Sequence, residues 1–304
     1  MKKAFLLGAG LGTRLRPLTN TVPKPLVPVF HRPLACHALD HLAEAGIEEV
    51  AINTHHLHQE WERTFPDATY RDLQLHFFHE RELLETGGGI KNIATFIGDD
   101  SVLVYNGDIL TNIDLQGLIA RHRSGGGSIT LASRSTGPGL HLEVQGEQVI
   151  DIRNKLGRGA GTHQFTGIYC LEPEVLDLIP PREKISIIPA FLTLAQGEKL
   201  GAFDADKGHW LDLGTREAYL ETHGIGGEMP PGLDHPRVHQ SARVVADAHI
   251  ENSWIGPDCV VGAGALVRDS ILWPGTVVTA GARLERCIVH SSTPVSGTHE
   301  DRDL

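Results

Sequence analysis

Apolar residues recur at every sixth position in the last quarter of this 304-residue chain. They are Val238, Val244 and Ile250, followed by Ile255, Val261 and Val267. Glycine and other small residues fill the intervals, most clearly over residues 256–264. A hexad of this kind indicates a β-helix, in which each coil stacks on its neighbours and the terminal coils need a cap. Residues 236–297 are therefore expected to form a short β-helix of a few coils, with slips in the period near Ser253 and Ser270.

The first 224 residues have a different texture, in which short apolar runs alternate with helical spacing. Residues 4–7 predict a strand, the apolar residues between Leu34 and Ala45 predict a helix, and residues 49–53 predict a second strand. Strand, helix, strand is the parallel crossover unit. Further strands are expected at residues 75–78, 101–105, 129–133, 141–144, 165–170, 200–203 and 209–211, and further helices at residues 88–96, 190–195 and 215–222. Residues 1–224 are thus expected to form one α/β domain.

A linker and a tail make up the rest of the chain. Residues 225–235 are rich in glycine and proline and are expected to link the two domains. Residues 298–304 are polar and are expected to form a frayed tail. A β-helix with few coils leaves apolar rungs and strand edges at its ends, which the first domain or another subunit must cover. We therefore expect a homo-oligomer that assembles through the β-helix.

Charge and cysteine content narrow the function classes. The chain has 27 Lys and Arg against 38 Asp and Glu, a net charge of −11, which argues against nucleic-acid binding through phosphate neutralisation. The four cysteines, Cys36, Cys170, Cys259 and Cys287, form no CxxC pair, so reduced, buried thiols in a cytoplasmic protein are expected. No stretch reaches the roughly 18 apolar residues of a membrane helix, and glycines and arginines from Gly8 onward interrupt any signal-peptide core.

The strongest chemical signal is the segment from Gly8 to Thr19, followed by Pro23-Lys24-Pro25. A strand opens here into a glycine-rich loop whose backbone N–H groups can approach a phosphate or a base. Arg14 and Lys24 supply cations for a triphosphate. A P-loop would require a lysine after Gly12, and a dinucleotide fingerprint would require the glycines to open a helix, which the prolines prevent. The loop is therefore expected to bind a nucleotide through cationic side chains.

This segment resembles the signature of the sugar-phosphate nucleotidyltransferases, also called NDP-sugar pyrophosphorylases, and the resemblance covers residues 1–224. It implies an α/β fold class: a Rossmann-like mixed sheet nucleotidyltransferase domain, here followed by a short left-handed β-helix. In family members the matching loop wraps the nucleotide and the matching lysine contacts phosphate. The resemblance implies Arg14 and Lys24 as catalytic cations. The positions that it assigns to the nucleotide are Leu7, Ala9, Gly10, Gly12, Thr13, Arg14 and Lys24.

A second segment, Leu83-Leu84-Glu85-Thr86-Gly87-Gly88-Gly89, resembles the part of the family that holds the base. Its last five residues are similar to those of the muramic acid 1-phosphate uridylyltransferases. Gly87 lacks a Cβ, so its backbone can lie against a ring. Glu82 matches an acidic or amide position that can accept a ring N–H from guanine or uracil, or else it is a solvated surface charge. The expected base contacts are therefore Glu82 and Gly87.

Two aspartates follow apolar strands, where open α/β sheets place their ligands. One is in Asn106-Gly107-Asp108, and the other is Asp212, in the segment from Gly208 to Thr215. Either aspartate alone is more often a helix cap or a turn residue. As a pair they match the two metal-binding aspartates of the family, and two carboxylates suit Mg²⁺ bridged to substrate phosphates. Asp108 and Asp212 are therefore the expected metal ligands, and Mg²⁺ is the expected cofactor.

The sugar phosphate is assigned to residues near two strands. Asn106 and Gly107 precede Asp108, and residues 165–169 resemble the sugar-contacting strand of the family, with the Thr166 hydroxyl available to the sugar. Many relatives carry a Glu-Lys-Pro element before this strand. Here the stretch is Ile152-Arg153-Asn154-Lys155, in which Lys155 or Arg153 replaces the lysine and the glutamate has no counterpart. This departure leaves the identity of the sugar open.

The expected reaction transfers a nucleoside monophosphate from an NTP to a sugar 1-phosphate and releases pyrophosphate. A β-helix after such a domain resembles the layout of mannose-1-phosphate guanylyltransferases, so GTP and mannose 1-phosphate are the first expected substrates. Uridylyl transfer to another sugar 1-phosphate is the alternative. A catalytically inactive subunit that binds a nucleotide sugar would be expected to lack Lys24, Asp108 or Asp212, and all three are present. An acyltransferase site needs more coils than residues 236–297 allow.

Overall fold

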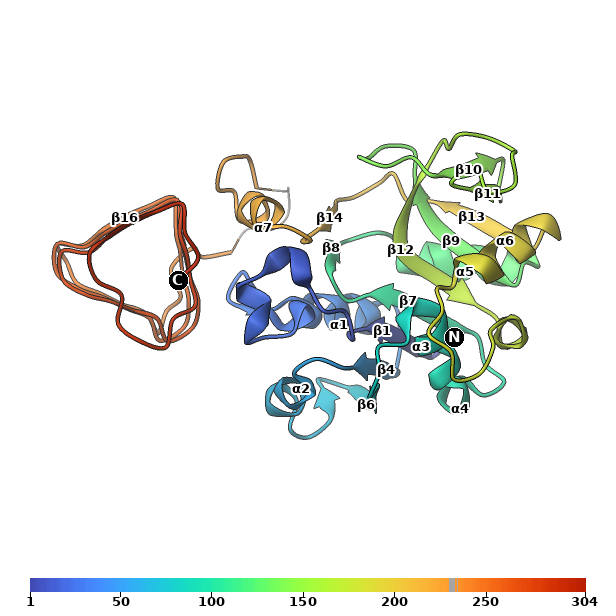
Figure 1. Ribbon diagram of the computed structural model, residues 1–304, viewed down its shortest axis with the longest axis horizontal. Helices are drawn as coiled ribbons and strands as arrows, with labels where there is room; N and C mark the ends of the chain where they lie inside the picture. Colours follow the sequence, from blue (N-terminus) through green and yellow to red (C-terminus); the bar gives the residue numbers. More distant parts are fainter. Residues whose placement is uncertain (230–232, 234) are drawn as a thin grey trace. The chain divides into compact units, whose positions relative to one another are not determined.

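The computed structural model describes residues 1–229, 233 and 235–304 (Figure 1). Part of the expected linker, residues 230–232 and 234, lies outside the described residues. The chain forms two compact units. The sheet unit comprises Met1–Leu11, Pro23–Pro25 and Ala35–Trp210, and the β-helix unit comprises Gly12–Val22, Leu26–Leu34 and Leu211–Leu304. Two segments near the start of the chain thus belong to the same unit as the β-helix, which a boundary at residue 224 does not anticipate.

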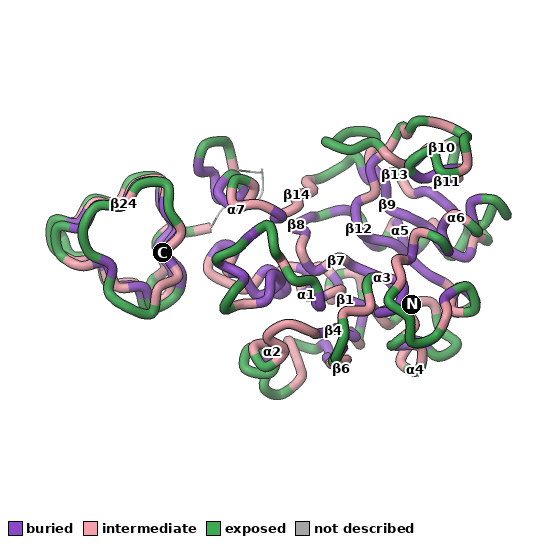
Figure 2. Tube along the Cα trace, viewed as in Figure 1, coloured by how far each residue is buried: buried purple, intermediate pink, exposed green. Residues whose placement is uncertain are grey.

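A ten-stranded mixed sheet forms the centre of the sheet unit, as the family resemblance predicts. In spatial order its strands are β10 (Leu142–Gln145), β11 (Gln148–Ile152), β13 (Leu200–Asp204), β9 (Ile129–Arg134), β12 (Gln164–Leu171), β7 (Val102–Asn106), β1 (Lys3–Leu7), β4 (Glu49–Thr54), β6 (Leu73–His79) and β5 (Thr69–Tyr70). β1 pairs in parallel with β4 and β7, whereas β12 runs antiparallel to β7. These central strands are buried, as Figure 2 shows, which explains their continuous apolar runs.

Helices connect the strands and supply much of the core. They are α1 (Leu34–Glu44), α2 (His58–Thr64), α3 (Glu85–Asn92), α4 (Ala94–Ile97), α5 (Leu115–Gly125), α6 (Ile188–Gln196) and, in the β-helix unit, α7 (Arg216–Thr222). Ile90 of α3 and Ile97 of α4 pack into the main core with Phe5. The expected helices over residues 34–45, 88–96, 190–195 and 215–222 are confirmed, although the second divides into α3 and α4. The sequence analysis missed α5, in which Asp114 accepts the Gly117 N–H at 2.8 Å as an N-terminal cap.

Shorter elements complete the two units. The strands are β2 (Pro28–Val29), β3 (Arg32–Pro33), β8 (Ile109–Thr111) and β14 (Trp210–Asp212). Short 3-10 helices lie at Thr13–Leu15, Leu18–Asn20, Lys24–Leu26 and Pro173–Leu178. Three of these 3-10 helices lie between Gly12 and Leu26, so the glycine-rich signature continues as short turns and not as one helix, as its prolines require.

The C-terminal part of the chain is a β-helix with three-sided coils (Figure 1). Its sheets are β15 (Arg243–Val244), β18 (Val260–Val261) and β21 (Val277–Val278); β16 (His249–Glu251), β19 (Leu266–Arg268), β22 (Arg283–Glu285) and β24 (Thr298–Glu300); and β17 (Trp254–Ile255), β20 (Ile271–Leu272) and β23 (Ile288–Val289). Val244 pairs with Val261 and Val261 with Val278, so equivalent residues lie 17 positions apart. Two sides of a coil follow the hexad, and the third is one residue shorter, as between the buried Val267 and Leu272.

The short side of each coil explains the slips near Ser253 and Ser270. These two residues are buried at equivalent corners, and the Ser270 N–H donates to Ser253 Oγ at 3.0 Å. One coil further, the Cys287 N–H donates to Ser270 Oγ at 2.9 Å. The buried serine hydroxyls therefore accept hydrogen bonds from backbone N–H groups at the corner that precedes the five-residue side of the next coil.

The end of the chain is ordered, and the expectation of a frayed tail is wrong. β24 pairs with β22 in parallel register. The Leu304 N–H donates to the Ile288 carbonyl at 2.9 Å, and the His290 N–H donates to the Leu304 carbonyl at 2.7 Å. Residues 298–304 thus continue the backbone pairing of the last coil, because backbone hydrogen bonds do not require apolar side chains.

One side of the β-helix is covered by other parts of its own unit. The Trp254 indole N–H donates to the His223 carbonyl at 2.8 Å, and the Trp273 indole N–H donates to Tyr219 Oη at 3.1 Å. The Phe30 ring lies 5.0 Å from the Trp254 ring, between centroids. The segment Leu26–Leu34 and helix α7 therefore pack on the sheet formed by β17, β20 and β23.

The cysteine side chains have the environment that the sequence predicts. Cys36, Cys170, Cys259 and Cys287 are free and buried, as expected. Over the described ranges of the chain, we find no helix with the length and apolar character needed to span a bilayer.

Candidate active site

The carboxyl ends of β1, β4 and β7 meet at one edge of the sheet, which we call the carboxyl edge. Leu7, the last residue of β1, pairs with Asn53 of β4 on one side and with Asn106 of β7 on the other. The expected nucleotide loop and the segment Asn106-Gly107-Asp108 therefore start side by side. Ligands of open α/β sheets bind outside such an edge.

Gly8 and Gly10 serve different purposes in the loop. A Cβ on Gly8 would lie 2.7 Å from the Asn53 carbonyl oxygen and 2.8 Å from the Trp61 ring, so the chain leaves β1 in close contact with its neighbours. The Gly8 N–H donates to Asn53 Oδ1 at 2.8 Å. Gly10 is exposed, and no atom of the described chain beyond its immediate neighbours lies within 4 Å of a Cβ placed there. The loop is therefore open to a ligand at Gly10, whereas Ala9 is buried.

Lys24 and Asp108, which the sequence analysis assigns to phosphate and to metal, are direct neighbours. Lys24 Nζ lies 2.7 Å from Asp108 Oδ2. The Lys24 side chain is 7% exposed and the Asp108 side chain is 36% exposed. Close approach of β7 to β1 depends on Gly107, since a Cβ there would lie 2.5 Å from the Leu7 carbonyl oxygen. The carboxyl edge thus holds a buried cation beside a partly exposed anion.

Arg14 and Asp212 form a second pair of the same kind, within the β-helix unit. Arg14 Nη2 lies 3.7 Å from Asp212 Oδ2, and the two side chains are 64% and 39% exposed. Arg14 belongs to the 3-10 helix Thr13–Leu15, which Gly12 introduces in the left-handed conformation with φ 59°. A Cβ on Gly214 would lie 2.7 Å from the guanidinium, so the arginine lies across the turn that follows Asp212. Each carboxylate expected to bind metal therefore faces a cation expected to bind phosphate.

Asp108, in the sheet unit, and Asp212, in the β-helix unit, are each the kind of ligand that suits a magnesium ion. Asp108 and Asp212 each offer carboxylate oxygens on a partly exposed side chain. Among the residues that the structure describes, no group of three or more His, Cys, Asp or Glu side chains could hold a metal by itself. Mg²⁺ is usually held by one or two carboxylates together with substrate phosphates and water, so each of these carboxylates fits it as a ligand.

A buried carboxylate fixes the start of the segment expected to hold the base. Glu80 is 2% exposed, and its Oε2 accepts the Leu84 N–H at 2.9 Å. Its Oε1 accepts from Asn53 Nδ2 at 2.7 Å, and Asn53 Oδ1 in turn accepts the Gly8 N–H. Burial raises the pKa of Glu80, although the hydrogen bonds from Asn53 and Leu84 oppose the rise. One chain of hydrogen bonds therefore joins the glycine loop to the base segment, through two residues that the sequence analysis missed.

The expected base contacts, Glu82 and Gly87, differ in their surroundings. Glu82 is exposed, two positions after the buried Glu80. A Cβ on Gly87 would lie 2.9 Å from backbone atoms of Ile185 and Ser186. Gly87 is therefore required where α3 packs on residues 185–186. The missing Cβ thus makes room for this packing, and the expected contact of the Gly87 backbone with the base stays a prediction.

Thr166 has a structural role, which corrects the expectation that its hydroxyl is available to a sugar. The residue is buried, and its Oγ1 donates to the Ala132 carbonyl at 2.8 Å. Its carbonyl accepts the Trp210 indole N–H at 2.7 Å. Asn106 lies beside the next residue, Gly167, where a Cβ would come within 2.5 Å of Asn106 Nδ2. Thr166 thus anchors β12 and Trp210, because its hydroxyl and its carbonyl are both engaged by the protein.

Lys155 is exposed in the turn after β11. The buried Asp151 carboxylate shapes this turn by accepting the N–H groups of Ile152 at 2.6 Å, Leu156 at 3.0 Å and Arg158 at 2.9 Å. Burial alone would raise the pKa of Asp151, but these backbone hydrogen bonds outweigh it and lower the pKa. The turn that stands in place of the Glu-Lys-Pro element is therefore well defined, with Lys155 directed to solvent.

A mixed sheet with a glycine-rich loop and a lysine–carboxylate pair at its carboxyl edge defines the class as a nucleotidyltransferase. Residues 3–225 match the family described as nucleotidyl transferase, and residues 238–300 match the GlmU-like C-terminal hexapeptide family. The solved structure of a UDP-glucose pyrophosphorylase from Acinetobacter baumannii has a similar fold, with a TM-score of 0.60 and 20% identity over 73% of this chain and 91% of that chain.

Two relatives place the chain more closely. It is 32% identical to a mannose-1-phosphate guanylyltransferase of Mycobacterium tuberculosis, over 87% of this chain and 74% of that protein. It is 28% identical to a UTP–glucose-1-phosphate uridylyltransferase of Synechocystis sp., over 87% of this chain and 81% of that protein. The chain belongs to the sugar-1-phosphate nucleotidyltransferase family.

Proposed function

We propose that this protein joins GTP to mannose 1-phosphate, giving GDP-mannose and pyrophosphate. The observation that carries the proposal is the Lys24–Asp108 pair, 2.7 Å apart at the carboxyl edge beside the glycine loop. The buried Lys24 cation can bind a phosphate group, and the partly exposed Asp108 carboxylate can bind the Mg²⁺ ion that accompanies this phosphate. The relationship to a mannose-1-phosphate guanylyltransferase and the appended β-helix support this choice of base and sugar.

The reaction needs no nucleophile from the protein. An oxygen of the sugar 1-phosphate forms a bond to the α-phosphorus of the NTP, the bond from that phosphorus to the bridging oxygen of the β-phosphate breaks, and pyrophosphate leaves. Such a step depends on positioning and on stabilisation of the developing negative charge. Arg14 and Lys24 are assigned to that charge. The loop from Leu7 to Thr13, open at Gly10, is assigned to the nucleotide.

Asp108 and Asp212 are the proposed ligands of Mg²⁺, together with substrate phosphates. When bound, the ion neutralises phosphate charge and polarises the reacting phosphoryl group. Asn106 and Gly107, at the end of β7, and the exposed Lys155 are the proposed contacts of the sugar phosphate.

Uridylyl transfer to another sugar 1-phosphate is the second candidate. A UTP–glucose-1-phosphate uridylyltransferase also aligns with 87% of the chain, and residues 85–89 resemble those of the muramic acid 1-phosphate uridylyltransferases. Both Glu80 oxygens already accept hydrogen bonds from the protein. The exposed Glu82 is therefore the proposed acceptor for the base, in either case.

Assembly and location are part of the same proposal. The hexapeptide match supports a homo-oligomer that assembles through the β-helix. The four free, buried cysteines support a cytoplasmic location, where thiols stay reduced.

A pyrophosphate-release screen tests the proposal. GTP, UTP, ATP, CTP and dTTP are each paired with mannose 1-phosphate, glucose 1-phosphate and muramic acid 1-phosphate, and Asp108→Asn serves as the inactive control. The highest kcat/KM is expected for GTP with mannose 1-phosphate. A higher value for a UTP pair would favour the second candidate. Nucleotide-sugar binding without pyrophosphate release from any pair would favour an inactive regulatory subunit.

A further inference from the structure

The end of the β-helix holds Arg216, the first residue of α7. Arg216 Nε donates to Asp303 Oδ1 at 2.8 Å, and Nη1 donates to Asp301 Oδ1 at 2.8 Å. Nη2 donates to the Arg286 carbonyl oxygen. All three guanidinium nitrogens are therefore engaged by residues of the last coils.

The first turn of a helix is an unfavourable position for a cation such as Arg216, so its contacts with Asp301 and Asp303 need an explanation. The N-terminal end of a helix carries a partial positive charge, which disfavours arginine in the first turn. Burial alone would lower the pKa of Arg216, but the hydrogen bond and charge of Asp303, followed by those of Asp301, raise it. The side chains of Arg216 and Asp303 are only 18% and 10% exposed. A shielded, directional ion pair thus offsets the unfavourable helix position.

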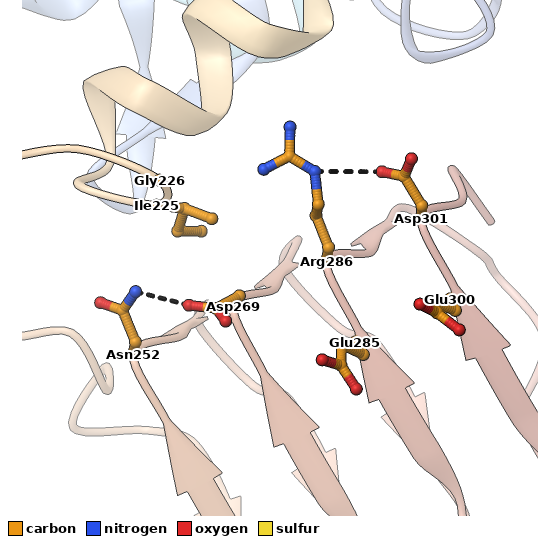
Figure 3. Close-up of a pocket in the computed structure, with 8 residues that line it drawn as sticks. All are labelled: Ile225, Gly226, Asn252, Asp269, Glu285, Arg286, Glu300 and Asp301. Carbon is orange, nitrogen blue, oxygen red and sulfur yellow. Dashed lines mark hydrogen bonds and ion pairs between the residues drawn. The ribbon is translucent and has the colours of Figure 1, made fainter.

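Asp301 extends these contacts to a neighbouring coil. Its Oδ1 lies 2.8 Å from Arg216 Nη1 and 3.1 Å from Arg286 Nε. Figure 3 shows the Arg286–Asp301 pair beside a pocket of about 480 Å³. These two residues directly follow β22 and β24, which pair in parallel. The residues that contact Arg216 therefore belong to two coils that are paired with each other.

Helix α7 connects Arg216 to the expected metal ligand Asp212. Only three residues separate Asp212 from α7, and the last of them, Thr215, caps the helix by accepting the Ala218 N–H at 3.2 Å. The Arg14 guanidinium lies across Gly214 and within 3.7 Å of Asp212. A shift of the first turn of α7 would therefore move the Asp212–Arg14 pair.

We propose that Arg216, Asp301 and Asp303 form a clamp through which the end of the β-helix positions Asp212 and Arg14. The inference rests on the proposed function, in which these two residues bind Mg²⁺ and the triphosphate. The clamp acts through α7, so its members are positioning residues. The β-helix then contributes to the active site of its own chain, in addition to any role in assembly.

Backbone amide exchange in the full-length chain tests the clamp directly. Arg216→Gln and Asp303→Asn each remove one side of it with little change in shape, and Arg216→Lys can keep one contact. Arg268→Gln is the matched control, since Arg268 pairs with Glu251 at 2.8 Å elsewhere on the same β-helix. Amides of residues 212–218 are expected to exchange at least about fivefold faster in the clamp variants and at the wild-type rate in the control.

Pyrophosphate release against Mg²⁺ concentration supplies the second measurement. The Mg²⁺ concentration that gives half-maximal turnover is expected to rise about tenfold in Arg216→Gln and Asp303→Asn, because outer partners of metal ligands have effects of this size. The value for Arg216→Lys should lie between those of these two variants and that of the wild type. Amide exchange and Mg²⁺ requirement equal to those of Arg268→Gln would overturn the clamp. A wild-type chain without pyrophosphate release would contradict the proposed function instead, and amide exchange would still decide whether the clamp holds residues 212–218.

Discussion

Lys24 and Asp108 lie 2.7 Å apart with the lysine buried, whereas Arg14 and Asp212 lie 3.7 Å apart with both side chains more than a third exposed. In the first pair, Lys24 begins the 3-10 helix Lys24–Leu26, and Asp108 lies in the turn between β7 and β8. In the second pair, Arg14 belongs to the 3-10 helix Thr13–Leu15, and Asp212 is the last residue of β14. The two pairs therefore combine the same charges but differ in burial, because the cation is buried in one pair and exposed in the other.

The difference suggests that the two pairs contribute differently to the stabilisation of negative charge. A buried charge next to a fixed carboxylate is preorganised and costs little to reorganise when phosphate binds. An exposed arginine at a longer distance can adjust to the substrate, but solvent and salt screen it. We therefore expect Lys24 to govern charge stabilisation and Arg14 to contribute a smaller, salt-dependent part.

Lys24→Ala is expected to have the largest effect. It removes a buried cation, and kcat/KM for the NTP should fall by about a thousandfold. Lys2→Ala is the matched control, because Lys2 carries the same charge in an exposed pair with Glu48. Lys3 is less suitable, since its Nζ donates to the Phe96 carbonyl at 2.8 Å. Equal losses for Lys24→Ala and Lys2→Ala would mean that the overall charge of the chain governs nucleotide use.

Arg14→Ala should cost less, about thirtyfold in kcat/KM, because an exposed cation is partly replaced by solvent ions. The deficit should shrink as salt rises from 50 to 500 mM (about a threefold change in Debye length), while the Lys24→Ala deficit stays nearly constant. Arg63→Ala, which removes an exposed arginine paired with Glu60 on α2, is the control. A loss in kcat/KM for Arg14→Ala that does not change with salt concentration would contradict the proposed difference between the two pairs.

Glu80→Gln should raise the KM for the NTP about tenfold, because an amide cannot accept both the Asn53 and the Leu84 hydrogen bonds. The base segment would lose its link to Gly8, with little change in kcat. Glu82→Gln is the informative comparison, since Glu82 is exposed and is the proposed acceptor for the base. Its effect should depend on the base, so the ratio of kcat/KM for GTP and UTP is measured for both variants. If only Glu80→Gln changed the ratio of kcat/KM for GTP and UTP, Glu80 and not Glu82 would be the residue that recognises the base.

The smallest effect on turnover is expected for Ser270→Ala, in the β-helix. It removes the acceptor of the Cys287 N–H and should lower the free energy of unfolding by about 1–2 kcal/mol, with kcat unchanged. Ser292→Ala changes an exposed serine of the same β-helix and should stay within about 0.5 kcal/mol of the wild type. Denaturant unfolding measures both. Equal stability of the two variants would mean that the hydrogen bonds of the buried serine hydroxyls do not stabilise the coils.

The sequence was sufficient wherever burial leaves a local pattern. Strands β1, β4 and β7 are buried on both faces, so each appears as an apolar run, and Asp108 follows the last of them. The β-helix appears as a hexad because its inward residues stack on equivalent residues of the next coil. The class of enzyme followed from the dense signature between Gly8 and Lys24, in which every element is local.

Long-range contacts could not be predicted in the same way. Asn53 is the last residue but one of β4, and Glu80 directly follows β6, but nothing local indicates that their side chains bond to each other. Thr166 is a polar residue on a strand, and only the position of the Ala132 carbonyl shows that its hydroxyl is engaged. The contact of Arg216 with Asp303 spans 87 positions, so its role depends entirely on the folded chain.

Asp108 and Asp212 are the proposed magnesium ligands of this nucleotidyltransferase, and a Mg²⁺ titration tests that assignment most directly. Pyrophosphate release is measured for the wild type, Asp108→Asn and Asp212→Asn with the best substrate pair. An asparagine keeps the shape but loses the charge, so turnover at limiting Mg²⁺ should fall by about a hundredfold or more in both variants. Turnover close to that of the wild type in either variant at limiting Mg²⁺ would contradict the assignment.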